Sequence, residues 1–220
     1  MRVLVIGGTG LISTPIVQQL IEQGHEPVLF NRGLTGSRLN GEVETIHGAR
    51  TDFDAFGKLM AGHSFDAVID MITFNAETAA NATEVFSGRT GQYVFCRTVC
   101  VYGKLGRIPA GEEEPHRPTG EYGRNKSRAE AVLMRAHNEG RFPVTILRPA
   151  HTFGPGAPLG DVWGRNSSLV PWLRAGRPMV VAGDGTTLWQ PCYVDDVARA
   201  FVHVLERKND AGTGIQCRRR

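Results

Sequence analysis

Cysteine is scarce in this sequence, and the way it is spaced excludes two classes of site. The four cysteines, Cys96, Cys100, Cys192 and Cys217, form no C-x-x-C pair and have no histidine nearby at metal-ligand spacing. A zinc site and a disulfide framework are therefore not expected, and no metal ligands are predicted. Buried free thiols in a reducing environment are the simpler interpretation.

Long hydrophobic runs and a strong charge of one sign are also missing. The chain has no run of about 20 apolar residues, and its start, MRVLVIGG, lacks the pattern of a signal peptide. We therefore expect a cytoplasmic protein with no membrane association. The 25 basic and 22 acidic residues leave a net charge of +3, so a nucleic acid is not the expected partner.

Short β-branched runs alternate with longer amphipathic segments along most of the chain. The runs predict strands at 2–7, 26–31, 43–48, 65–72, 92–96 and 143–149, and the segments between them predict helices near 11–23, 52–61, 75–87 and 122–139. Because the runs are apolar on both faces, helices should cover both sides of the sheet. This alternation predicts an α/β fold with a doubly wound parallel sheet, Rossmann-like in type.

Beyond the sixth expected strand the sequence becomes rich in glycine and proline. It predicts a helix near 167–175, a strand at 179–182 and a helix at 195–207, whereas the final GIQCRRR shows neither pattern. A chain of 220 residues is long enough for one main core. We divide it into an NAD(P)-binding Rossmann domain, 1–150, and a partial substrate-binding region, 151–220, whose helix at 195–207 packs back on the sheet.

The stretch GGTGLIS, residues 7–13, follows the first strand and opens the first helix. Glycines at this place allow a tight turn and let backbone N–H groups approach a pyrophosphate at the positive end of the helix dipole. An ordinary connection from strand to helix is the alternative. We predict that Gly7, Gly10, Leu11 and Ile12 bind a dinucleotide, with Ser13 small enough to stand at the third glycine position.

Asn31 and Arg32 stand at the end of the second strand, where a carboxylate would hydrogen-bond the adenosine ribose of NAD. A carboxylate would repel a 2′-phosphate, whereas the Arg32 guanidinium can bind one. NADP is therefore favoured over NAD as the cofactor. Arg32 as a solvated loop residue, or stacked on adenine, is the alternative.

The stretch EYGRNK, residues 121–126, places Tyr122 and Lys126 four residues apart on one face of a helix. With four tyrosines and four lysines in the chain, only about 0.07 such pairs are expected by chance. A nearby ammonium lowers the pKa of a phenol and makes it usable as an acid/base. Thr98 follows the fifth strand, at the sheet edge where ligands bind, so its hydroxyl could hold a substrate oxygen; a turn residue is the alternative.

Together these stretches make the sequence resemble the extended short-chain dehydrogenases/reductases, in their NAD(P)-dependent epimerase/dehydratase family. The motifs that carry the resemblance are GGTGLIS at 7–13, YVFCRTVCVYG at 93–103, YGRNK at 122–126, ILRPAHTFGPG at 146–156 and YVDDVARAF at 193–201. The resemblance implies that Tyr122 is the catalytic acid/base, that Lys126 lowers its pKa and holds the nicotinamide ribose, and that Thr98 positions the reacting oxygen. It also implies a contact between the backbone after Pro149 and the carboxamide, and a sugar nucleotide or related hydroxyl compound as substrate.

The sequence departs from the family pattern in three places. Ala49 stands where an Asp near adenine is common, so Asp52 or the backbone could take that role, and Arg97 stands where a small hydroxyl residue is common. Extended members continue with a further strand and a C-terminal substrate-binding region, so we expect a chain truncated at its C-terminus. Whether the shortened chain is active stays open.

The first functional expectation is an NAD(P)-dependent oxidoreductase of the epimerase/dehydratase type that transfers a hydride with a tyrosine acid/base. The alternative is a noncatalytic NADP-binding or RNA-binding protein on the same fold. The presence of Thr98, Tyr122 and Lys126 favours the enzyme. The choice among epimerisation, dehydration and reduction stays open, as does the oligomeric state, with a homodimer among the expectations.

Overall fold

The computed structural model describes residues 1–34, 39, 41–157, 169–178, 183–186, 188–206 and 214–217. The strands are β1 (Arg2–Ile6), β2 (Glu26–Asn31), β3 (Thr45–His47), β4 (Ala67–Asp70), β5 (Gln92–Cys96), β6 (Val144–Pro149), β7 (His151–Phe153), β8 (Pro191–Tyr193) and β9 (Gly214–Cys217). The helices are α1 (Ser13–Glu22), α2 (Phe53–Ala61), α3 (Ala76–Phe86), α4 (Glu121–Asn138), α5 (Leu169–Arg174) and α6 (Val194–His203), with short 3-10 turns η1 (Val99–Val101) and η3 (Val204–Glu206).

The main sheet is parallel and doubly wound, as the sequence predicted. Its strand order is β3-β2-β1-β4-β5-β6-β9, and each neighbouring pair runs parallel. The chain starts at β1, moves outward to β2 and β3, and then returns to β4 on the other side of β1. In such a sheet ligands bind outside the carboxyl ends of the strands, where this reversal opens a crevice.

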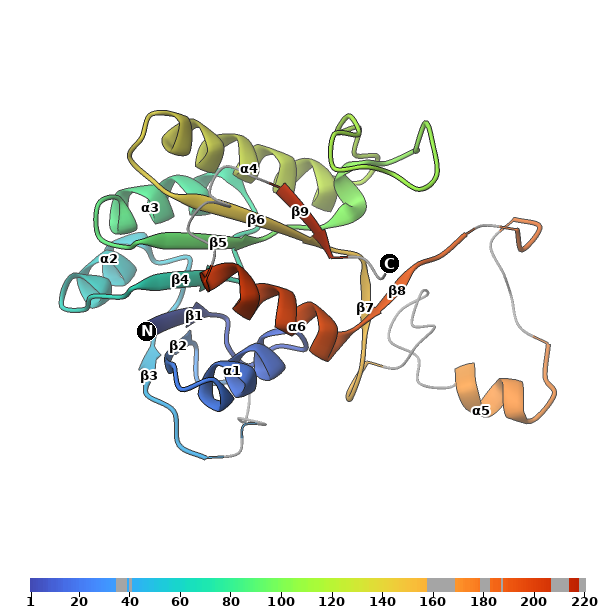
Figure 1. Cartoon of the computed structure of the whole chain (residues 1–220), viewed down its shortest axis with the longest axis horizontal. Coiled ribbons are helices and arrows are strands. Elements are labelled where there is room, and N and C mark those ends of the chain that lie inside the picture. Colours follow the sequence, from blue (N-terminus) through green and yellow to red (C-terminus); the bar gives the residue numbers. More distant parts are fainter. Residues whose placement is uncertain are drawn as a thin grey trace.

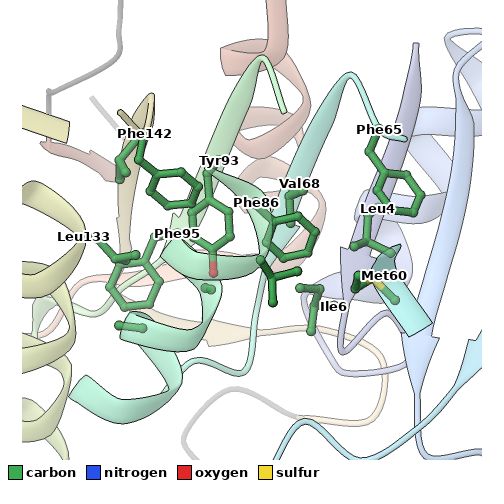
Figure 2. Close-up of a cluster of buried hydrophobic side chains, with 14 of the residues drawn as sticks. Leu4, Ile6, Met60, Phe65, Val68, Phe86, Tyr93, Phe95, Leu133 and Phe142 are labelled. Atoms are coloured by element: carbon green, nitrogen blue, oxygen red, sulfur yellow. The ribbon is translucent and has the colours of Figure 1, made fainter. Parts of the chain in front are cut away.

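Helices cover both faces of the sheet (Figure 1). Helices α2, α3 and α4 lie on one face, and α1 and α6 lie on the other (Figure 1). Each face has its own apolar core. Figure 2 shows the first of these, in which the Tyr93 and Phe142 rings pack 4.8 Å apart between the sheet and the helices. On the opposite face, Val197 and Phe201 of α6 join the core that contains Val5 and Ile16.

Two expectations about the C-terminal part were wrong. The segment GIQC at 214–217 was expected to lack a strand pattern, but it forms β9 and pairs with β6, with Ile146 opposite Gly214. The strands β7 and β8 were not expected either, and they form a separate parallel pair. All three strands are three or four residues long, so their pairing with distant segments, rather than their own sequence pattern, defines them. The strand expected at 179–182 lies outside the described residues.

Within the described ranges, none of the helices is long and apolar enough to cross a membrane. The same residues contain no group of three or more His, Cys, Asp or Glu side chains placed to hold a metal ion.

Candidate functional site

The turn between β1 and α1 is built around Gly7, Gly10 and Ser13. Gly7 has a φ of +86°, which L side chains rarely adopt, and a Cβ there would lie 2.6 Å from Ile72 Cγ2. The Gly10 N–H donates to Ser13 Oγ (2.7 Å), and that hydroxyl donates to the Gly7 carbonyl (2.6 Å). Ser13 therefore closes the turn with its hydroxyl, in addition to being small enough for the helix to pack closely.

A cleft of about 920 Å³ opens beside this turn at the carboxyl edge of the sheet. Its lining includes Gly7, Gly10 and Leu11 from the turn, and Asn31 and Arg32 from the end of β2. The described lining residues contain no Asp or Glu. A polyanionic dinucleotide fits such a cleft, because the glycine turn leaves room for a phosphate backbone and no carboxylate repels it.

Asn31 and Arg32, at the end of β2, both line this cleft. The Asn31 carbonyl accepts from the Gly48 N–H (3.0 Å), and its side chain accepts from the Gly33 N–H (2.8 Å). The Arg32 side chain is exposed and lines the cleft. Both residues thus line the cleft, and their contact with the adenosine end of a dinucleotide stays a prediction.

Asp52 or the backbone was expected to take the role of the missing Asp near adenine, and this stays a prediction. Asp52 is the N-cap of α2, where its side chain accepts from the Ala55 N–H (3.0 Å), and it does not line the cleft. Arg50 and Thr51 line the cleft instead. The buried Arg50 guanidinium donates to Asn81 Oδ1 (2.7 Å) and to the Thr78 carbonyl (2.9 Å), so it joins the wall of the cleft to α3.

The three expected catalytic residues come together at the end of β5 and the start of α4. Thr98 caps η1, accepting from the Cys100 N–H (3.2 Å), and its side chain lies close enough to the Tyr122 phenol to lower the pKa of that phenol. Lys126 lies one helical turn after Tyr122, and its Nζ donates to the Cys96 carbonyl (2.7 Å), two residues before Thr98. The strand end therefore contacts both α4 residues at once.

The electrostatics around Tyr122 differ from the expectation. The pKa of Tyr122 is raised to about 12, chiefly because burial disfavours the phenolate, while Arg97 and the Thr98 hydrogen bond act in the lowering direction. Lys126 is not among the groups that lower it. Burial also lowers the pKa of Lys126, which is only 1% exposed. A phenol is protonated at neutral pH with or without this shift, and Tyr122 is 49% exposed.

Arg97 belongs to a buried cluster in which two cations share one anion. The Arg97 guanidinium pairs with one Glu130 carboxylate oxygen, and Arg148 Nη2 donates to the other (2.7 Å). Arg97 Nη2 also donates to Ser127 Oγ (3.1 Å), next to Lys126 in α4. The cluster ties β5 and β6 to the helix that carries Tyr122 and leaves one buried positive charge in excess near it.

Three expected cofactor residues, Ile12, Lys126 and Pro149, do not line the cleft. The Ile12 side chain packs against the core under α1, and Lys126 and Pro149 are buried. Contacts from these residues to a cofactor stay a prediction. His151 does line the cleft, with its ring centroid 4.9 Å from that of Trp189 and its Nε2 buried without a hydrogen-bond partner in the described part of the chain.

Sequence reasoning missed Arg50 and Phe74 as residues of the cleft. Phe74 follows β4, so the rule that strand carboxyl ends meet at one edge could have found it. Its ring contacts Tyr122, with centroids 6.4 Å apart, and Lys126, whose Nζ lies 4.7 Å from the ring centroid. Nothing in the pattern around Arg50 indicated that its side chain turns into the wall of the cleft.

Comparison with known proteins agrees with this fold. The family model described as "NAD dependent epimerase/dehydratase family" matches residues 3–216. Among curated proteins, the chain is 29% identical over 215 residues to 2′-dehydrokanamycin reductase of Streptomyces kanamyceticus, covering 98% of this chain and 60% of that protein. It is 28% identical over 221 residues to the chloroplast stem-loop binding protein of 41 kDa b of Arabidopsis thaliana, covering 93% of this chain and 55% of that protein. The chain thus spans little more than half the length of these two relatives.

Solved structures show the same fold. Pal from Bacillus thuringiensis superposes with a TM-score of 0.83 at 23% identity, over 98% of this chain and 77% of that one. UDP-glucuronic acid 4-epimerase from Bacillus cereus, solved with UDP-glucuronic acid and NAD, superposes with a TM-score of 0.81 at 21% identity, over 100% of this chain and 78% of that one.

Proposed function

Because the chain belongs to the NAD-dependent epimerase/dehydratase family, we propose that it is an NAD(P)-dependent oxidoreductase that uses Tyr122 as its acid/base. The observation that carries this proposal is the meeting of Thr98, Tyr122 and Lys126 beside the cleft that the glycine turn opens. A nicotinamide cofactor, when bound, accepts or donates the hydride. The protein's own residues then have to hold the reacting oxygen and move its proton.

Thr98 and Tyr122 divide that work between them. The Thr98 side chain lies close enough to the Tyr122 phenol to affect its pKa, so an oxygen placed against both hydroxyls would be held by two groups. The protonated phenol donates a proton to a keto oxygen while it is reduced, and the phenolate accepts one from a hydroxyl while it is oxidised.

Lys126 and the glycine turn are assigned to the cofactor. We place the pyrophosphate at the start of α1, over Gly7 and Gly10, and the nicotinamide ribose near Lys126. Gly7 has no room for a side chain, which supports a close approach of phosphate to the backbone.

The substrate class that we propose is a sugar nucleotide or a related hydroxyl or keto compound. The support comes from the relatives. The chain is 24% identical over 234 residues to UDP-glucose 4-epimerase of Lacticaseibacillus casei, and it is 29% identical over 215 residues to 2′-dehydrokanamycin reductase. Since the chain spans only part of these proteins, we propose a class of substrate and no particular compound.

Turnover tests the catalytic assignment. One member of a panel of sugar nucleotides and keto sugars should cause oxidation of NADPH or reduction of NAD. The absorbance of the reduced cofactor measures the rate. Tyr122→Phe should lower the rate by about 100-fold or more, since it removes the proton donor. Tyr193→Phe is the matched control, because Tyr193 lies on β8 and does not line the cleft. Equal rates for wild type and Tyr122→Phe would show that the assignment is wrong.

NADP is the cofactor that we propose in preference to NAD. The support is the exposed Arg32 at the cleft, together with the lack of any carboxylate among the described lining residues. Arg32→Ala should weaken NADPH binding by about tenfold and leave NADH binding nearly unchanged, because only NADPH carries the 2′-phosphate. Lys58→Ala, which removes an exposed cation from α2, should change neither. An equal effect of Arg32→Ala on both nucleotides would contradict the preference.

A second candidate function is supported by one relative, whose name says that it binds a stem-loop. In that case the chain would bind a structured nucleic acid without turnover. Salt-sensitive binding of a stem-loop oligonucleotide, with no conversion of any substrate in the panel, would favour this candidate.

A further inference from the structure

Lys126 is enclosed in this structure although the proposed site needs its ammonium. The residue is 1% exposed, and its Nζ lies between two aromatic rings, 4.7 Å from the centroid of Phe74 and 4.8 Å from that of Phe95. An ammonium has three N–H donors, and in the described residues its one hydrogen bond goes to the Cys96 carbonyl (2.7 Å). Two donors therefore face ring surfaces, where a polar ligand could replace a cation–π contact.

The two rings differ in their freedom to move. Phe95 is fully buried in the sheet core, beside Leu133 of α4 (Figure 2). Phe74 is 48% exposed and lines the cleft. Only Phe74 can therefore leave Lys126 without disturbing the core.

Phe74 also stands at the boundary between the two halves of the proposed site. The cleft is lined by the glycine turn, by Asn31 and Arg32, and by Phe74, but not by Thr98, Tyr122 or Lys126. The Phe74 ring contacts Tyr122 on its other side. The ring thus separates the dinucleotide cleft from the ammonium and stands against the phenol.

The backbone on both sides of Phe74 is held in place. The buried Asp70 side chain accepts from the Ile72 N–H (2.9 Å), the Thr73 N–H (2.8 Å) and the Thr73 hydroxyl (2.8 Å). After Phe74, the Asn75 side chain caps α3 by accepting from the Thr78 N–H (2.9 Å). Movement of the ring is therefore a side-chain rotation, which exposed residues make rapidly, and not a movement of the loop.

We propose that Phe74 is a positioning residue whose ring covers Lys126 when the cleft holds no nucleotide and turns away so that Lys126 can reach the cofactor. The Phe74 ring keeps the Lys126 ammonium out of contact with water until a nucleotide binds. This inference rests on the proposed function in one respect, the assignment of Lys126 to the nucleotide.

Acetylation of single lysines by acetic anhydride, read by peptide mass spectrometry, tests the cover without any turnover. Lys58 and Lys104 are exposed and serve as internal references in the same molecule. In wild-type protein without nucleotide, Lys126 should be acetylated far more slowly than either reference. In Phe74→Ala its rate, relative to Lys58, should rise by about tenfold or more, because the exposed side of its ammonium is opened. Phe74→Trp keeps an aromatic cover and should leave Lys126 slow.

Titration of NADPH then separates this inference from the proposed function. If NADPH binds and again slows acetylation of Lys126 in Phe74→Ala, the ammonium faces the nucleotide and both ideas are supported. If Lys126 in Phe74→Ala reacts as slowly as in wild type while the variant melts normally, Phe74 is no cover and the inference is wrong. If Lys126 becomes reactive in Phe74→Ala but saturating NADPH gives no protection, Phe74 does cover Lys126. The assignment of Lys126 to the cofactor is then wrong.

Discussion

The hydroxyl of Tyr122 lies in surroundings that favour its protonated form. Burial raises its pKa to about 12, against an ordinary value near 10 in an unfolded chain. Arg97 and Thr98 oppose this shift, and Lys126 contacts Cys96 and two aromatic rings instead of the phenol. Among the described residues, the groups that lower the pKa of Tyr122 thus come from the end of β5 and not from its own helix.

The raised pKa of Tyr122 predicts a dependence of stability on pH. Because the folded pKa lies above the unfolded one, the stabilisation is complete below about pH 10 and is lost as the pH rises toward about 12. Tyr122→Phe has no such group, so its free energy of unfolding should fall less steeply than that of wild type over this range. Urea denaturation at successive pH values measures both slopes. The buried Tyr93, whose pKa is also raised, is present in both proteins and cancels; identical slopes would contradict the account.

Single residues of the site could be predicted where the signal is local. Gly7, Asn31 and Arg32 each stand directly at a strand end, so the order of elements was enough to place them at the cleft. Arg97 was noticed only as a departure from a family pattern. Its contact with Glu130 spans 33 positions of the sequence, so a pattern within one element cannot predict that the two side chains meet.

At the scale of elements, the catalytic residues depend on how α4 is fixed against the strands. Arg97 at the end of β5 and Arg148 in β6 both bind Glu130 of α4. Tyr122, Lys126 and Glu130 follow one another at intervals of four residues on this helix, so they share a face. The buried ion pairs therefore set the height and rotation at which α4 presents the phenol to Thr98.

Removing the shared anion should be much more harmful than removing one cation. Glu130→Gln leaves two buried guanidinium groups without their carboxylate and should lower the free energy of unfolding by about 3–5 kcal/mol. Arg97→Met leaves Glu130 paired with Arg148 in a one-to-one pair and should cost clearly less. Urea denaturation of the two variants at neutral pH compares them. A larger decrease in the free energy of unfolding for Arg97→Met than for Glu130→Gln would show that the excess positive charge does not destabilise the fold.

The elements themselves were predicted unevenly, for a physical reason. Apart from β3, the first six strands carry apolar runs, because each of them is buried on one or both faces. The strands β7, β8 and β9 exist through pairing with segments elsewhere in the chain. Each of these short segments, HTF, PCY and GIQC, mixes polar and apolar residues, so no apolar run marked it as a strand.

At the scale of the whole molecule, the sheet separates two apolar cores and leaves one edge for ligands. The carboxyl ends of β1, β2 and β4 bring Gly7, Arg32 and Phe74 to the cleft, while β5 and α4 bring the acid/base residues beside it. The doubly wound order of strands is what makes these distant segments neighbours. The division into a cofactor domain at 1–150 and a substrate region at 151–220 stays a prediction.

The proposed function requires that a pyridine dinucleotide binds over the glycine turn. Calorimetric titration of NADPH into wild type, Gly7→Ala and Gly24→Ala tests it most directly, because the two glycines share a positive φ (+86° and +74°), whereas a Cβ would meet Ile72 at Gly7 and nothing within 4 Å at Gly24. We expect one NADPH per wild-type chain, binding weakened by about tenfold or more in Gly7→Ala, and binding unchanged in Gly24→Ala. Absence of binding to wild type, or equal affinities for all three proteins, would contradict the claim.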